Sequence, residues 1–306
     1  MTGSVEEELE ILLERHQEAV VRGDAAEAEW LAVEFLAAVS SQEAGEPGED
    51  LKLKMAAHAS EETADWGDAE RAYRRAAELA ETEGDDASTF KAHLDLSRLY
   101  SLLDRHDESL SAARDAVISA RRTEMAPILT MALESYGSEL LHHGNVDAAS
   151  AAAEEILALV GDEKLYALSR ARALVLRSRC SLARGRDDDA ARDLDAALPA
   201  IRPFEQSLLV AGYQSALSRW WQTHATLRTR HGDPAGAAEA MRIAARHARN
   251  VASAPQLEGP YKHNGLARTL HRMALALLAN GDTQEAQAAF RESRAIRESI
   301  GLPTLG

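Results

Sequence analysis

Residues 129–149 read LTMALESYGSELLHHGNVDAA, and this stretch carries the pattern that decides the fold. Its apolar side chains recur at intervals of three and four, which predicts a helix over about 126–143. Gly144 is suited to a left-handed helix cap, and Asn145 is suited to cap a second helix, which we expect over about 146–160. The stretch therefore predicts two helices joined by a tight turn.

Small residues flank this turn at fixed distances. Gly137 stands seven positions before Gly144, and Ala149 stands five positions after it. Two helices that cross closely need short side chains at their contact, whereas a glycine inside a helix is otherwise unfavourable by roughly 1 kcal/mol. We therefore expect Gly137 to lie where the two helices touch.

The same arrangement recurs about every forty residues along the 306-residue chain. The spacings between successive turn anchors are 41, 40, 40, 41, 47 and 49, and the anchors are Gly23, Ala64, Asp104, Gly144, Gly185, Gly232 and Gly281. Self-similarity at one period is typical of a solenoid, in which each unit buries its apolar face only by stacking on its neighbours. The repeat thus favours one continuous stack over two separate domains.

Two further triplets around these turns resemble the tetratricopeptide repeat family. Ala69, Tyr73 and Ala76 are similar to the second-helix signature of that family, as are Ala237, Met241 and Ala244. Leu133 with Gly137, and Trp221 with Ala225, resemble its first-helix signature. The period is nearer 40 than the usual 34 residues, as in some bacterial and kinesin-light-chain-like members, and His16, His93 and the missing closing prolines depart from the pattern.

The resemblance implies an all-α fold, a right-handed α-solenoid of about seven helix hairpins. We expect a single domain over 1–306, with repeats at about 4–40, 51–84, 87–122, 124–160, 164–201, 205–252 and 262–300. Residues 42–50 are predicted to form a polar connector. Residues 199–206 and 252–265 lengthen the last junctions, either as loops on a binding face or as surface length that the fold tolerates.

The composition narrows the class of partner. The chain has 34 basic and 50 acidic residues, a net charge of −16, which disfavours general nucleic-acid binding and docking on an anionic membrane. Its acidic start lacks a signal segment, and a single cysteine, Cys180, suits a reducing compartment. These features predict a cytoplasmic protein.

No catalytic or metal-binding motif stands out. His142 and His143 precede a turn, where histidine is favourable at a helix end, and the run Asp187–Asp189 fits the start of a helix. The sequence has no His-Glu-x-x-His or Cys-x-x-Cys pattern, no phosphate-cradling glycine loop and no set of nucleophile, base and orienting group. We therefore expect no enzyme, no cofactor and no metal ion.

The family resemblance implies that the first helix of each pair lines a concave groove, chiefly thirteen, ten and six residues before the turn. Across the seven repeats these 21 positions carry seven Lys or Arg and two Glu, a net +5 on an acidic chain. Either they are ordinary solvated helix faces, or they form a basic groove suited to an acidic peptide or a carboxylate. The groove residues predicted to bind are Lys54, His58, Lys91, Leu94, Arg98, Arg172, Val175, Arg179, Arg219, Arg268 and His271.

The predicted function is that of a non-enzymatic adaptor or scaffold that binds a protein or peptide, of acidic character, in this groove. The alternative is a regulatory sensor that takes a small peptide or metabolite inside the superhelix. An enzyme on a helical scaffold is the least favoured class. No nucleic-acid or membrane partner is expected.

Overall fold

The computed structural model describes residues 49–163, 166–206, 211–254 and 259–305, with a few single residues between 11 and 27. Apart from those few residues, the first predicted repeat, over 4–40, and most of the connector at 42–50 lie outside the described residues. Within the described ranges every regular element is helical, and none is a strand. This confirms the predicted all-α solenoid.

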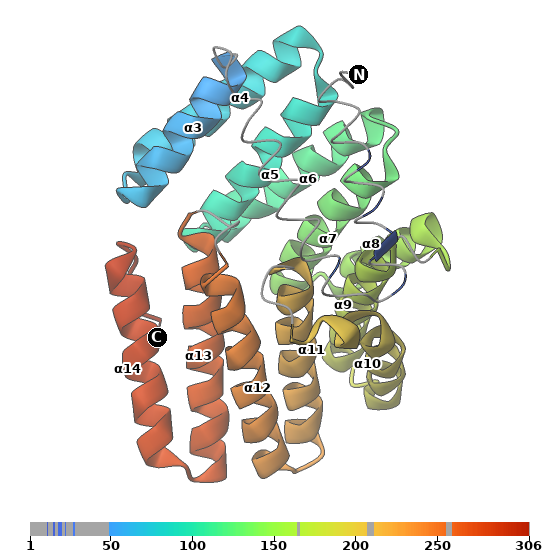
Figure 1. The fold of residues 1–306 in the computed structure, drawn as a ribbon, viewed down its shortest axis with the longest axis vertical. Helices are drawn as coiled ribbons and strands as arrows, with labels where there is room; N and C mark the ends of the chain where they lie inside the picture. Colours follow the sequence, from blue (N-terminus) through green and yellow to red (C-terminus); the bar gives the residue numbers. More distant parts are fainter. Residues whose placement is uncertain are drawn as a thin grey trace.

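The described helices form six consecutive pairs (Figure 1). Their bounds are α3 (Glu49–Glu62), α4 (Trp66–Glu83), α5 (Asp86–Leu102), α6 (His106–Arg122), α7 (Ala126–His142), α8 (Val146–Val160), α9 (Ala167–Ala183), α10 (Asp187–Ile201), α11 (Ala211–Arg230), α12 (Pro234–Ala252), α13 (Tyr261–Asn280) and α14 (Thr283–Ser299), with a 3₁₀ turn η2 at Arg202–Phe204. The hairpin predicted from the opening stretch is therefore α7 with α8.

The turn inside each described pair uses the predicted anchor in a left-handed conformation. Four anchors are glycines with φ between 72° and 89°, whereas Ala64 and Asp104 both have φ 58°. An L-residue in this conformation is unfavourable by roughly 1–2 kcal/mol, so something else must hold these two turns. The caps also follow the prediction, since the Asn145 side chain accepts a hydrogen bond from the Ala148 amide at 3.4 Å.

The small residues lie at the helix contacts, as expected. A Cβ atom added to Gly137 would stand 2.6 Å from Leu176 Cδ2, 3.3 Å from Ala152 Cβ and 3.6 Å from the Ala149 carbonyl. Gly137 is thus wedged between its own hairpin and the next one. Where serine fills the equivalent positions, its hydroxyl ties the helices together, and Ser178 Oγ donates to the Ala190 carbonyl at 2.9 Å.

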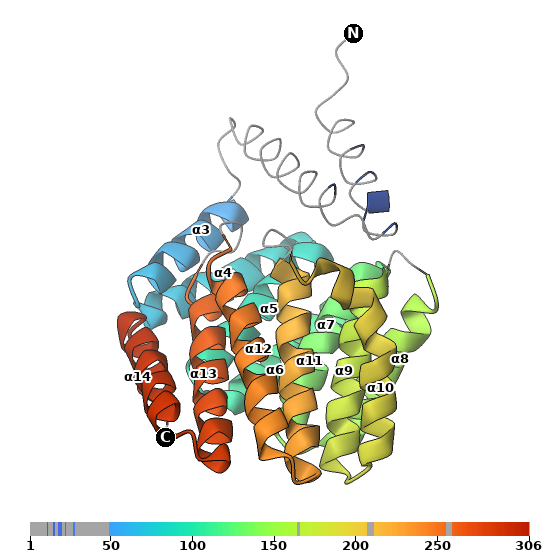
Figure 2. The ribbon, with the colours of Figure 1, turned by 60° about the horizontal axis from the view of Figure 1, so that its bottom comes forward.

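The stack of hairpins curves until its two ends meet. Figures 1 and 2 show α13 and α14 lying beside the ends of α3, α4 and α5. We call this junction the seam and define it by Glu61, Ser101 and Asp104 on one side and Tyr261, Arg268 and Arg297 on the other. These residues are joined across the seam by hydrogen bonds and ion pairs, so the described hairpins form a closed ring.

Each side of the seam contributes buried polar groups. The Tyr261 hydroxyl donates to the carboxylate of Glu61, and Arg268 donates to Asp104 and, at 3.1 Å, to the Ser101 carbonyl. Arg297, whose side chain is only 1% exposed, reaches Asp104 Oδ2 at 3.0 Å. The two anchors that are not glycine therefore lie at the seam, because Ala64 also faces it, 2.7 Å from where a Cβ on Gly301 would stand.

A buried histidine makes stability depend on pH. His247 is fully buried and bonds Gln214 Oε1 through Nδ1 at 2.7 Å, while its Nε2 has no hydrogen-bond partner among the described residues. Burial, followed by the Arg246 charge, lowers the pKa of His247 to about 4 despite the opposing Glu205. The folded protein thus holds this imidazole neutral.

We expect His247 to destabilise the protein in mild acid. Between pH 6.5 and 4 the unfolded chain binds a proton here and the folded protein does not, so stability is present above pH 6.5 and is lost as pH falls. The loss at pH 5 should be about 2 kcal/mol. Urea unfolding at pH 7 and pH 5 measures it against His247→Asn, which removes the titration. Equal pH dependence in the two proteins would contradict the assignment.

Candidate ligand-binding cavity

The ring encloses a cavity of about 590 Å³. Its wall comes mainly from the first helix of successive pairs, α5, α7, α9, α11 and α13. Among the described residues, the lining carries five basic side chains and two carboxylates, a formal net charge of +3. The basic lining residues are Arg98, Arg172, Arg219, Lys262 and Arg268.

The structure brings some of the predicted groove residues together and leaves others apart. Leu94, Arg98, Arg172, Arg219 and Arg268 line the cavity, and Val175 and Arg179 line a small recess that opens beside it. Leu94 and Val175 are buried in the core, so they form the wall behind the charged groups. The residues outside both linings are Lys54, His58, Lys91 and His271.

His58, Lys91 and His271 are each engaged by a neighbouring side chain. His58 Nδ1 lies 3.2 Å from the Tyr73 hydroxyl, and hydrogen bonding to Glu61 raises the pKa of His58 against the effect of its burial. Lys91 Nζ pairs with Asp95 at 2.5 Å. The ring of His271 packs edge-on against Phe290, with centroids 5.1 Å apart.

The two predicted insertions differ in whether they reach the cavity. The first, at 199–206, completes α10 and η2, and its Phe204 is buried and stacks on Tyr213 with ring centroids 3.9 Å apart. The second, at 252–265, lies partly outside the described residues, and its end contributes Tyr261, Lys262, Asn264 and Gly265 to the cavity. Only the second insertion therefore reaches the candidate site.

Glu134 on α7 is the acidic centre of the cavity wall. Its Oε2 accepts from Arg172 Nη1 at 3.2 Å, and its Oε1 accepts from Arg219 Nη1 at 2.7 Å. Burial alone would raise the pKa of Glu134, but the two guanidinium groups outweigh it and hold the pKa below its usual range. Arg172 also donates to the Gly212 carbonyl at 3.1 Å, which fixes its position.

Two more arginines face the same region. Arg179 on α9 has no hydrogen-bond or ion-pair partner among the described residues, and Arg272 on α13 donates to Gln222 Oε1 at 2.7 Å. Burial and then the nearby charges of Arg219 and Arg272 lower the pKa of Arg179 to about 10. We refer to Arg172, Arg179, Arg219 and Arg272 as the arginine cluster.

Arg272 was not predicted from the sequence. The offset of ten residues before the turn selected His271, whose ring turns toward α14 and packs on Phe290. Arg272 stands four residues after Arg268, which places both on one face of α13. This four-residue spacing from Arg268 could have identified Arg272 from the sequence.

Three histidines gather beside the cavity at the α5–α6 and α7–α8 turns. The rings of His106 and His142 are 4.1 Å apart, and His143 Nε2 lies 3.0 Å from the His106 carbonyl. Burial has the largest effect on the pKa of His142 and lowers it. The positive charges of His106, Arg268 and Arg272 lower it further. In the part of the chain that the structure describes, no group of three or more His, Cys, Asp or Glu residues has the arrangement of a metal site.

Other sequence features resolve into helix ends and ion pairs. Asp187, at the start of α10, pairs with Arg230 Nε at 2.8 Å.

Among the described helices, none combines the length and apolar character that crossing a membrane requires.

The chain resembles solved structures only at the level of the fold. No protein-family model matches it, and no curated protein matches its sequence. It superposes on a Rap protein complexed with competence and sporulation factor, with a TM-score of 0.60 and 13% identity over 98% of this chain and 77% of that one.

Two other solved structures are similar to it over most of both chains. NprR in complex with its cognate peptide NprX gives a TM-score of 0.56 at 12% identity, covering 98% of this chain and 83% of that one. A tetratricopeptide repeat protein from Parabacteroides merdae gives 0.54 at 16% identity, covering 96% and 97%. The fold of this chain is therefore that of tetratricopeptide-repeat solenoids, as the recurring turn predicts.

Proposed function

We propose that this chain is a non-enzymatic peptide-binding protein that takes an acidic peptide segment into the cavity of the ring. The observation that carries the proposal is the arginine cluster, in which guanidinium groups from α9 and α11 pair with one carboxylate, Glu134, and Arg179 adds a further positive charge beside them. Guanidinium groups recognise carboxylates through paired hydrogen bonds. Two proteins of similar fold are solved with a peptide or a factor bound, which agrees with this class of ligand.

Between an adaptor and a sensor, ring closure favours the sensor. An open groove can receive part of a large partner, whereas the seam closes this ring around about 590 Å³, a volume typical of small-ligand sites. A short acidic peptide fits that space better than a folded domain does. We further infer a cytoplasmic location, with which the single, buried and unpaired Cys180 agrees.

Filling the cavity is expected to abolish peptide capture. Ser135 lines the cavity on α7, so Ser135→Trp places an indole in the space the ligand needs. The matched control is Ser111→Trp, at an exposed position on α6 outside the cavity lining. Both variants and the wild type are incubated with the short-peptide fraction of a host lysate, and the retained peptides are identified by mass spectrometry.

The wild type and Ser111→Trp should retain the same acidic peptides, with less retained as salt rises because charge attraction is screened. Ser135→Trp should retain none of them. Equal retention by all three proteins would place binding outside the cavity and contradict the proposed function.

A further inference from the structure

We propose that His58 and Glu61 form a proton-controlled latch at the seam, which holds the ring closed most firmly when the His58 imidazole is charged. The inference goes beyond ligand binding, because it concerns how firmly the two ends of the stack are joined. It rests on a carboxylate that is buried where α3 meets α13.

Glu61 is a fully buried member of the seam. Its side chain is 0% exposed, and its Oε1 atom accepts from the hydroxyl of Tyr261, which comes from the other end of the stack. Among the residues that the structure describes, its ion-pair partner is His58, whose Nδ1 lies 3.4 Å from Oε2 and which stands three positions earlier on α3. Because a buried carboxylate without a cation is strongly destabilising, the charge on His58 sets how stable this side of the seam is.

The groups around His58 leave Glu61 as the charge that the imidazole must balance. The charged and titratable groups that interact with His58 are Glu61 on α3, Tyr73 on α4, and Lys91 and Asp95 on α5, and Tyr261 of α13 joins them through Glu61. Lys91 and Asp95 neutralise each other at 2.5 Å. Burial, followed by the Glu61 charge, raises the pKa of both tyrosine hydroxyls, so both stay protonated near neutral pH. The cluster is thus neutral when His58 is charged, and it carries one net negative charge when His58 is neutral.

The position of Nδ1 makes this pair sensitive to a single proton. Nδ1 lies 3.2 Å from the Tyr73 hydroxyl and 3.4 Å from Glu61 Oε2. A charged imidazole carries a hydrogen on Nδ1 and attracts the carboxylate, whereas a neutral imidazole that accepts from Tyr73 through Nδ1 turns a lone pair toward it. The proton exchanges with solvent, since the His58 side chain is 36% exposed.

The latch weakens as pH rises. The hydrogen bond to Glu61 has the largest effect on the pKa of His58 and raises it above the ordinary value of 6.5, despite the opposing effect of burial. The stability from this pair is therefore fully present below pH 6.5 and is lost as pH rises through the folded-state pKa. This is opposite to His247, which acts below pH 6.5. Because Tyr261 also lines the cavity, release of the latch loosens a wall of the binding site.

Thermal unfolding at pH 6.5 and pH 8.5 tests the latch. The melting temperature of the wild type should fall by about 2 °C more over this interval than that of His58→Gln, which cannot be charged; water screens a part-exposed pair, which keeps the expected fall small. Glu61→Gln keeps an acceptor for Tyr261 but has no charge to balance, so it should be as insensitive as His58→Gln. The matched control is His231→Gln at the α11–α12 turn, where His231 also lies beside a carboxylate, Asp187, and it should behave like the wild type.

Hydrogen exchange shows whether the effect lies at the seam. After correction for the intrinsic effect of pH, the amides of residues 261–268 should exchange faster relative to those of α7 at pH 8.5 than at pH 6.5 in the wild type, and in neither seam variant. The same pH dependence of melting temperature in the wild type and in His58→Gln or Glu61→Gln would overturn the proposal. A fall in melting temperature without faster exchange over 261–268 would overturn it as well.

Discussion

Asp104→Gly is expected to open the ring. Asp104 accepts from both Arg268 and Arg297, and Arg297 is 1% exposed with no other carboxylate partner among the described residues. Removing one member of a fully buried ion pair typically costs roughly 3–5 kcal/mol, and the 40% exposure of the Asp104 side chain places this loss at the low end of that range. Glycine also relieves the positive φ of this turn, which offsets part of the cost, so we expect a net loss of about 2 kcal/mol.

The change should be visible in the shape of the molecule as well as in its stability. Without the Asp104 carboxylate, α13 and α14 lose their ion pairs to the α5–α6 turn, and small-angle X-ray scattering should report a larger radius of gyration. The matched control is Ala64→Gly, at the other seam turn with φ 58°, which relieves the same backbone strain and removes no charge. Asp104→Gly with the scattering curve and stability of Ala64→Gly would show that these ion pairs do not close the ring.

Gly137→Leu is expected to destabilise the protein by about 3 kcal/mol. The first added carbon alone would stand 2.6 Å from Leu176 Cδ2, and the rest of the side chain has no space between α7, α8 and α9. Overpacking of a buried position usually costs 1–3 kcal/mol and occasionally more, and here it separates two hairpins at once. Urea unfolding followed by circular dichroism measures the loss.

Ala151→Leu provides the comparison for this prediction. It adds the same side chain to the same hairpin at an exposed position of α8 and should change stability by less than about 0.5 kcal/mol. Similar destabilisation by both substitutions would mean that helix α7 does not depend on a glycine at its crossing point.

The repeated turn predicts the helices and their pairing because both depend on local sequence. Gly144 with Asn145 marks a helix end and a helix start, and the small residues at fixed distances mark the crossing. The choice of first helices as the inner wall follows from the family resemblance. These features need no knowledge of residues more than about forty positions away.

Ring closure was not predicted, because it depends on residues 164 to 200 positions apart. The angle between successive hairpins accumulates along the stack, and no single repeat encodes the sum. The one sequence feature that accompanies ring closure is that two of the described turn anchors, Ala64 and Asp104, are not glycine. In the sequence they are exceptions to the turn, and in the structure they are the turns that face the other end.

Only some of the site residues were predicted, because the prediction used fixed offsets from each turn. Fixed offsets from the turn selected Arg172, Arg179 and Arg219 on the helices that follow the common register. They missed Arg272, because the inner face of the 20-residue α13 also includes the position after the fixed offset. They also selected Leu94 and Val175, which are buried and form the wall behind the charged groups.

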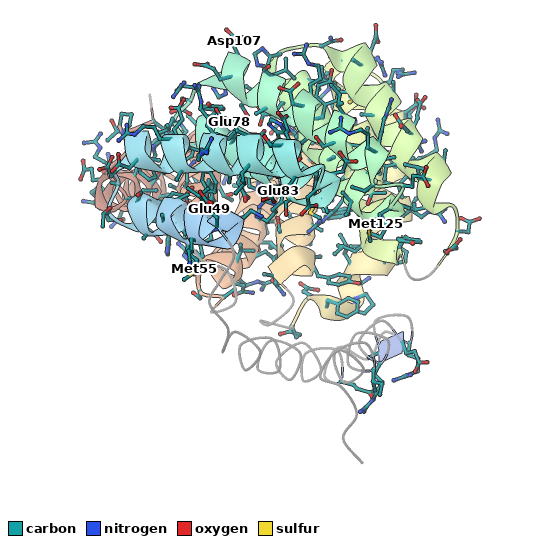
Figure 3. All side chains as sticks on the ribbon, turned by 90° about the horizontal axis from the view of Figure 1, so that it is seen from above. Glu49, Met55, Glu78, Glu83, Asp107 and Met125 are labelled. Atoms are coloured by element: carbon teal, nitrogen blue, oxygen red, sulfur yellow. The ribbon has the colours of Figure 1, made fainter. Side chains whose placement is uncertain are left out.

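Site-specific photo-crosslinking tests most directly whether the ligand lies inside the ring. A benzoylphenylalanine is placed at Met131, which lines the cavity, or at Met125, which is exposed at the start of the same helix and is labelled in Figure 3. Each protein is irradiated in host lysate, and the mass added to the chain is measured. We predict that Met131 captures a short acidic peptide and that Met125 does not. Capture of a large folded protein at Met125, with no peptide at Met131, would contradict a ring that binds its ligand within.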